Sequence, residues 1–240
     1  MTPDMQDPTR AGPPVPDVPG RFARFSLAEI EALAAKAARG AGMPWGVAEE
    51  AGAAARWLAE QDMPGPEMLL AHLVSYDGRP WADVAPAVSD GVWRHPAGRW
   101  LCPIATGTAL ADWAALPGGP GSQPITIERV ASPILLLPFA ALGSDSARLP
   151  LRVRWQGMVV IVARRSLTVA AGPDDLLIER AGAVTVEAAA DVQARPRVLA
   201  TGRVIALDVW RSLDALALRT TVPASERSRA GAGAGTLDND

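Results

Sequence analysis

The chain has 240 residues, of which 49% are hydrophobic, so it can bury a sizeable core and is not a wholly disordered protein. Its formal net charge of -3 gives no excess positive field for a phosphate backbone, so we expect no nucleic-acid partner. The longest apolar stretch, Ile134 to Leu142, is shorter than the roughly 20 residues that cross a bilayer, and the single cysteine fits a reducing compartment, so we expect a cytoplasmic protein without membrane contact.

Residues 1–22 contain six prolines and show no hydrophobic periodicity, which predicts a disordered arm. No linker-like change of composition follows, so residues 23–240 are expected to form a single α+β domain. We expect an N-terminal layer of about three helices packed on a mostly antiparallel sheet. The expected parts are a helical part at 26–78, a β-rich part at 98–207, and a C-terminal helix with a Gly-rich tail at 208–240.

The helical part contains three amphipathic patterns. Ser26 and Glu29 match a capping box, and apolar residues follow at helical spacing until Gly40. Proline precedes the second pattern and stands in the first turn of the third, where its fixed backbone angle suits a helix start. The three predicted helices cover about 26–40, 44–60 and 66–76.

Short segments rich in β-branched residues and separated by turn formers predict the sheet. The clearest hairpin is at 151–163, with its turn at Gly157, and its apolar return strand is expected to be central. A last helix is expected from about Asp208 through Leu216. The predicted strands are 125–130, 134–139, 151–155, 158–163, 166–171, 175–180, 183–188 and 203–209.

Four segments carry a resemblance to a known family. They are KAARGAGMPWGVAEEAGAAARWL (36–58), CPIATGTALADW (102–113), SPILLLPF (132–139) and TTVPASERSRAGAGAGTLDND (220–240). From about Ser26 onward the chain resembles a bacterial family catalogued only as a domain of unknown function. The resemblance implies no reaction.

Residues 26–78 also resemble the N-terminal helices of the malate and L-lactate type dehydrogenases that lack a Rossmann fold. That family carries a Ser-His-Gly catalytic motif after its second helix. This chain has Met63-Pro64-Gly65-Pro66 there, without the histidine.

Two basic residues at the end of the first predicted helix are candidates for ligand binding. Lys36 is the only lysine of the chain, and Arg39 lies one helical turn further on. Residues at i and i+3 project from one side of a helix, so this pair could hold a carboxylate or a phosphate. The alternative is that both stabilise the negative end of the helix dipole in water.

The C-terminal tail supplies four more candidates. Alternate glycines can form an anion-binding turn, with Ser228 and Arg229 beside it as donors. Asp238 and Asp240 suit a hard cation or a basic patch on the same protein, and we expect the tail to fold back toward Lys36. The alternative is a frayed Gly-rich terminus.

Cys102 could be a nucleophile if His95 or His72 acts as its base and Asp112 orients that base. The alternative is a buried, unreactive thiol and a core histidine on the third helix. One cysteine and two histidines are too few for a typical structural zinc site, and the sequence identifies no cofactor. Four tryptophans in the region between helices and sheet could line a pocket or belong to the core: Trp81, Trp93, Trp100 and Trp113.

Two classes of function fit these features. The favoured one is an enzyme or binding protein for a small molecule, with its pocket between the helices and the sheet. The alternative is a non-catalytic accessory subunit of a metabolic enzyme, or a homo-oligomer, for which an exposed apolar patch would be expected. Whether the protein is an enzyme is left open by the sequence.

Overall fold

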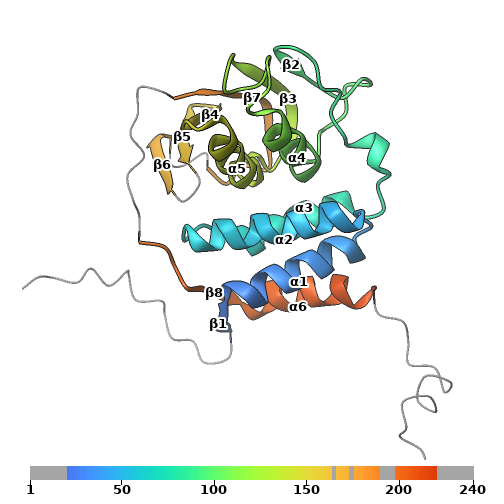
Figure 1. The fold of residues 1–240 in the computed structure, drawn as a ribbon. Coiled ribbons are helices and arrows are strands. Elements are labelled where there is room, and N and C mark those ends of the chain that lie inside the picture. The colour runs from blue at the N-terminus through green and yellow to red at the C-terminus, as the bar shows by residue number, and fades with distance from the viewer. Residues whose placement is uncertain (1–20, 164–165, 173–175, 190–197, 221–240) are drawn as a thin grey trace, which may run out of the picture.

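A computed structural model describes residues 21–163, 166–172, 176–189 and 198–220 (Figure 1). Within these ranges the chain forms six α-helices and eight β-strands, so the predicted α+β class is confirmed. The predicted arm extended to residue 22, but strand β1 (Phe22–Ser26) already begins there. Residues 1–20 and the tail from residue 221 lie outside the described residues.

The three predicted N-terminal helices are confirmed. The Ser26 hydroxyl accepts a hydrogen bond from the Glu29 amide at 3.3 Å, and the Glu29 carboxylate accepts one from the Ser26 amide at 2.8 Å. This reciprocal capping satisfies amides that a helix start leaves without partners. The bounds are α1 (Leu27–Gly40), α2 (Trp45–Glu60) and α3 (Gly65–Tyr76).

Helix α1 lies between α2 and the last helix, α6 (Leu207–Leu218) (Figure 1). Its buried face consists mainly of alanine, and α2 also buries alanines, so these helices can approach closely. At Gly40, an added Cβ atom would lie 1.8 Å from the carbonyl oxygen of Leu216. Only glycine therefore allows the observed contact between α1 and α6.

Strand β1 pairs with β8 (Gly202–Ala206) in an antiparallel two-stranded ribbon that is separate from the larger sheet. The ring of Phe25, on β1, stacks on Trp210 at 3.5 Å between centroids. The prediction of one strand over 203–209 is wrong in its second half, because α6 begins at Leu207. Strand β1 was not predicted, since its partner lies about 180 residues away in the sequence.

The larger sheet has the strand order β2-β3-β7-β4-β5-β6, in which only β2 and β3 are parallel among the described pairs. The hairpin between β4 and β5 turns at Gln156 and Gly157, both with positive φ. Strand β5 was expected to be central. It is interior, but it lies next to the edge strand β6. The strands are β2 (Val92–Trp93), β3 (Ile125–Ala131), β4 (Leu151–Trp155), β5 (Met158–Ala163), β6 (Ser166–Ala171) and β7 (Arg180–Ala188).

Helices were missed in the middle of the chain. The segment 134–139, predicted as a strand, belongs to the short helix η2 (Pro133–Leu136) and to α5 (Leu137–Ala147). A short apolar run fits a buried helix as well as a buried strand, so its pattern is ambiguous. Helix α4 (Pro103–Trp113) was not predicted, and of the predicted strand 175–180 only Arg180 is in β7.

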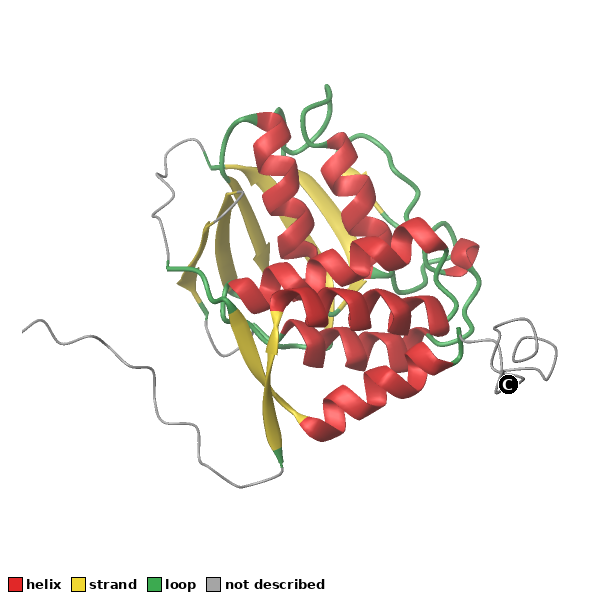
Figure 2. Cartoon of the chain, turned by 60° about the horizontal axis from the view of Figure 1, so that its bottom comes forward, coloured by secondary structure: helices red, strands yellow, loops and turns green. Residues whose placement is uncertain are grey.

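Helices cover one face of the larger sheet (Figure 2). Helix α5 contacts β4 and β5, α2 contacts both α4 and α5, and α3 contacts η2. Helix α2 therefore contacts the sheet partly through α4 and α5. In the part of the chain that the structure describes, no helix combines the length and apolar character needed to cross a membrane.

Candidate functional site

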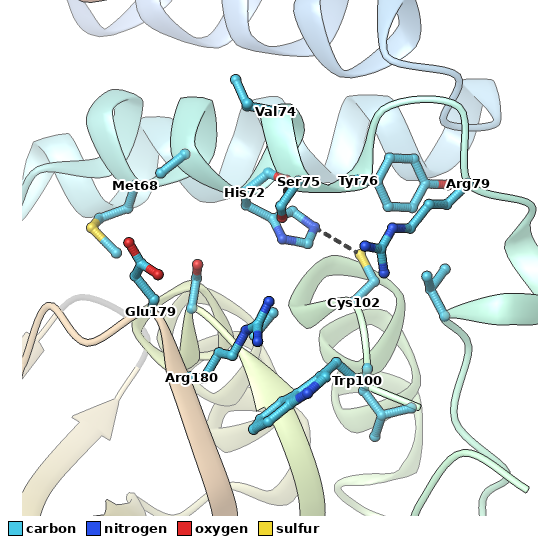
Figure 3. Close-up of a pocket in the computed structure, with 15 residues that line it drawn as sticks. Met68, His72, Val74, Ser75, Tyr76, Arg79, Trp100, Cys102, Glu179 and Arg180 are labelled. Atoms are coloured by element: carbon cyan, nitrogen blue, oxygen red, sulfur yellow. Dashed lines mark hydrogen bonds between the residues drawn. The ribbon is translucent and has the colours of Figure 1, made fainter. Parts of the chain in front are cut away.

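A cavity of about 260 Å³ lies between α3 and one end of the larger sheet (Figure 3). Its walls come from α3 between Met68 and Tyr76, from the segment between α3 and Val84, from the segment before α4, and from the adjoining ends of β3 and β7. The lining residues are Met68, Ala71, His72, Val74, Ser75, Tyr76, Arg79, Val84, Trp100, Leu101, Cys102, Ala131, Ser132, Glu179 and Arg180.

Backbone hydrogen bonds fix the segment that carries Cys102. The Leu101 amide donates to the Arg129 carbonyl at 2.7 Å, and the Leu101 carbonyl accepts from Ala131 at 3.1 Å, so this segment pairs with the end of β3. The Cys102 amide donates to the Val84 carbonyl at 2.9 Å. Cys102 is also the N-cap residue of α4, with a proline next to it.

The pairing of β3 with β7 fixes the side of the cavity that the sheet forms. Ala131 lies opposite Arg180 in this antiparallel pair. Just beyond it, the Ser132 amide donates to the Glu179 carbonyl at 2.7 Å. Ser132 has a left-handed backbone conformation, with φ 41°. This turn directs the chain from β3 into η2 and leaves Ser132 in the cavity wall.

The loop after α3 positions Arg79. Its amide donates to the Tyr76 carbonyl at 2.9 Å, and the neighbouring Gly78 amide donates to Ala41 at 3.3 Å. Asp77 accepts two hydrogen bonds of 2.8 Å from the guanidinium of Arg219, at the end of α6. The loop is therefore attached to α1 and α6 as well as to α3.

His72 and Cys102 form a close pair at the bottom of the cavity. Nε2 of His72 lies 3.2 Å from Sγ of Cys102, and the two residues are 3% and 2% exposed. Burial, with a smaller contribution from the positive charge of Arg79, lowers the pKa of His72 to about 4. Burial raises the pKa of Cys102 to about 11. At neutral pH the pair is therefore an imidazole and a thiol, both uncharged, and not an imidazolium with a reactive thiolate.

The second ring nitrogen of His72 has no hydrogen-bond partner among the described residues. Nδ1 is buried, whereas Nε2 is engaged with Cys102. A neutral imidazole carries its proton on one nitrogen, so Nδ1 donates if Cys102 donates to Nε2, and otherwise accepts. In both cases, Nδ1 has one hydrogen bond left to form.

Two guanidinium groups reach the cavity from opposite walls. Figure 3 shows Arg79 extending from the loop after α3 and Arg180 extending from β7, with Trp100 below them. The guanidinium carbon of Arg180 lies 5.2 Å from the ring centroid of Trp100, and that of Arg129 lies 4.9 Å from it. Such cation–π contacts restrain the long arginine side chains.

The candidate binding residues at the end of α1, Lys36 and Arg39, lie outside the cavity. Lys36 is exposed, and neither it nor Arg39 lines this cavity. Arg39 donates to the Met43 carbonyl at 2.8 Å, and its guanidinium lies 5.2 Å from the ring centroid of Trp45. These contacts are those of a residue that stabilises the helix end and the turn after it. The tail candidates lie outside the described residues: Ser228, Arg229, Asp238 and Asp240.

The candidate constellation of Cys102 with His95 and Asp112 does not form, and Cys102 is buried, as the alternative interpretation expected. Both ring nitrogens of His95 bond backbone groups: Nε2 contacts the Ala82 carbonyl at 2.9 Å, and Nδ1 accepts from the Ala97 amide at 3.0 Å. Asp112 stands ten residues along α4 from Cys102, about 15 Å at the rise of an α-helix. His72 is instead the histidine beside the thiol.

The sequence interpretation missed several lining residues. Arg79, Ser132 and Arg180 were not singled out, and His72 was treated mainly as a core residue. Arg79 and Arg180 stand just outside or at the end of a regular element, a position from which side chains often reach a site, but this signal is weak. Of the four tryptophans, Trp100 lines the cavity, whereas Trp93 is fully buried.

No group of three or more His, Cys, Asp or Glu side chains is placed to hold a metal ion within the described ranges. The polar groups that the cavity does offer are an imidazole, a thiol, hydroxyls, one carboxylate and two guanidinium groups. This set suits hydrogen bonding to an organic molecule.

Comparison with known proteins gives little further information. No curated protein matches the chain in sequence. A malate dehydrogenase from Entamoeba histolytica is similar in structure with a TM-score of 0.41 and 10% identity, over 67% of this chain and 50% of that chain. The chain thus covers half the length of that protein, and a similarity this low carries no information on activity. Residues 25–102 match the model of a family described as "Protein of unknown function (DUF3726)", which confirms, for this part of the chain, the resemblance to a family known only as a domain of unknown function.

Proposed function

We propose that the protein binds a small molecule in the cavity between α3 and the ends of β3 and β7. The main support is His72, which lines the cavity and whose buried Nδ1 has no partner among the described residues. A buried polar atom without a hydrogen bond costs about 1–3 kcal/mol. A bound molecule that bonds Nδ1 recovers this free energy.

The protonation states of His72 and Cys102 favour binding of a ligand over nucleophilic attack by Cys102. A thiol with a pKa of about 11 is protonated at neutral pH, and the imidazole beside it is neutral. Cys102 then orients the ring of His72 through Nε2, and Nδ1 is left for another hydrogen-bond partner. In this proposal Cys102 is a positioning residue.

A thermal-shift screen against a library of small metabolites tests the proposal. A compound at 100 times its dissociation constant adds about 2.7 kcal/mol to the free energy of unfolding, which raises the Tm by roughly 5–10 °C for a chain of this size. The rise should be lost in His72→Leu and retained in Lys36→Ala, which changes an exposed residue outside the cavity.

A second readout covers the case in which His72→Leu is poorly folded. The compound should also shift the imidazole NMR signals of His72 and not those of His95, whose nitrogens are bonded to backbone. If no compound raises the Tm, or if the hits stabilise His72→Leu equally and leave the His72 signals unchanged, the proposal is wrong. The accessory-subunit hypothesis would then be preferred.

A further inference from the structure

The geometry points to a small organic acid as the molecule that this cavity binds, with its acidic group held by Arg79 and Arg180 and its apolar part packed against Met68, Val84 and Leu101. This inference rests on the proposed function and adds the chemical class of the ligand. It is carried by three features of the cavity: its charge, its volume and the nature of its inner wall.

The charged residues that line the cavity are two arginines and one glutamate, whereas the chain as a whole has a net charge of -3. Neither Arg79 nor Arg180 forms an ion pair within 4 Å in the described part of the chain, and neither does Glu179. By contrast, Arg219 binds Asp77 right beside Arg79. The cavity therefore presents two guanidinium groups and one carboxylate, none of them in a described ion pair, and the guanidinium groups are in excess.

Guanidinium groups suit a carboxylate better than a cation or a neutral group. The planar fork of an arginine donates two parallel hydrogen bonds to a carboxylate, and such charge-assisted bonds are about twice as strong as neutral ones. The contact between Arg180 and Trp100 holds one of the two forks in place before a ligand arrives. Less side-chain entropy is then lost on binding.

The volume indicates how much of a molecule the cavity can enclose. A cavity of about 260 Å³ corresponds to about nine water-sized volumes of roughly 30 Å³ each. It therefore accommodates a body of about nine non-hydrogen atoms, which is the size of a small organic acid and much less than a nucleotide.

The inner wall is apolar apart from His72 and Cys102. Met68, Val84 and Leu101 line the cavity and are buried, at 9%, 2% and 0% exposure. Because the two arginines are exposed and these side chains are buried, the cavity has a charged mouth and an apolar interior. An acid with an apolar body matches this polarity, whereas a bare inorganic anion would leave the inner wall without contacts.

Three probes of equal shape and different charge test the inference. Benzoate, benzamide and benzamidine each have about nine non-hydrogen atoms, which matches the volume. They carry a negative, no and a positive charge, respectively. Inorganic phosphate is the fourth probe, an anion without an apolar body. Binding is measured by thermal shift and by the His72 imidazole signals of the full chain.

Benzoate is expected to bind at least tenfold more tightly than benzamide, benzamidine or phosphate. Arg79→Gln and Arg180→Gln should each weaken benzoate binding by about tenfold and leave benzamide binding nearly unchanged. The matched control is Arg56→Gln, which removes a surface cation paired with Glu31 at 2.8 Å on α1 and α2. This control should bind benzoate like the parent.

The outcomes separate this inference from the proposed function. If benzamide or benzamidine binds as tightly as benzoate and shifts the imidazole NMR signals of His72, the cavity is still a small-molecule site, but the inferred preference for acids is wrong. If phosphate binds as tightly as benzoate, the inference that the ligand has an apolar organic body is wrong. If none of the four probes binds although a library compound does, the inference is wrong and the proposed function stands. If no compound of any class binds, both are wrong.

Discussion

Lowering the pH from 7 to 4.5 should destabilise the protein through His72 by about 2 kcal/mol. The pKa of His72 is about 4 in the folded protein, mainly because of burial and secondarily because of Arg79, against 6.5 for an exposed histidine. Between these two values the unfolded chain binds a proton that the folded chain does not. The free energy of unfolding therefore falls as the pH falls through this window, and the total loss below pH 4 is about 3 kcal/mol.

Urea unfolding at both pH values, on the parent and on His72→Gln, measures this contribution. Carboxylates also titrate in this range. Glu29, for example, has a pKa lowered by its bonds with Ser26, so it too loses stabilising free energy as the pH falls. This loss is common to both proteins and cancels in the comparison. The parent should lose about 2 kcal/mol more than His72→Gln between pH 7 and pH 4.5.

Histidine NMR gives an independent check. The chain has only two histidines, so His72→Gln assigns both sets of imidazole signals. The His72 signals of the folded protein should not titrate between pH 7.5 and about 5. A native pKa near 6.5, or equal acid sensitivity of the parent and His72→Gln, would refute the buried, neutral imidazole on which the proposed site depends.

Three further outcomes are expected. The thiol of Cys102, with its pKa raised to about 11 by burial, should react with iodoacetamide at neutral pH roughly 100-fold more slowly in the native than in the urea-unfolded protein, and fast native labelling would contradict this. Gly40→Ala should lower the free energy of unfolding by about 1–3 kcal/mol in urea titration, because its Cβ would meet the Leu216 carbonyl, whereas Gly46→Ala has open space and should be neutral or slightly stabilising. Ser26→Ala removes the α1 cap and should lower the same free energy by about 1 kcal/mol, and an unchanged urea midpoint would refute a contribution from the cap.

The N-terminal helices were predictable because their signals are local. The capping box at Ser26, the glycine that ends α1 and the proline before α2 act within a few residues of each helix end. In the middle of the chain, α4, η2 and α5 each have a proline in the first turn but no side-chain cap. The apolar run at 134–139 was predicted as a strand, and only contacts with the sheet and with α2 decide that it is helical. Pairing of β1 with β8 is likewise a long-range event.

A pocket between the helices and the sheet was expected, but the residues that line the cavity could not be predicted, because its walls come from four parts of the chain. They are the α3 region, the segment 100–102, the β3 end at 131–132 and the β7 start at 179–180. The pairing of Ala131 with Arg180 depends on the sheet register, which the sequence did not define. The sequence suggested that His72 or His95 could serve Cys102. The choice between them depended on the placement of α3, and this is a tertiary property.

Lys36 and His72 show why the rarity of a residue type is a weaker guide to a site than its surroundings. Lys36 was singled out as the only lysine in an arginine-rich chain, but its side chain is exposed. Water satisfies an exposed ammonium, which therefore needs no partner. His72 lines a cavity, and its buried Nδ1 has no described partner, so a hydrogen bond from a bound molecule would stabilise the protein. Substituting Lys36 should therefore leave binding unchanged, while substituting His72 should abolish it.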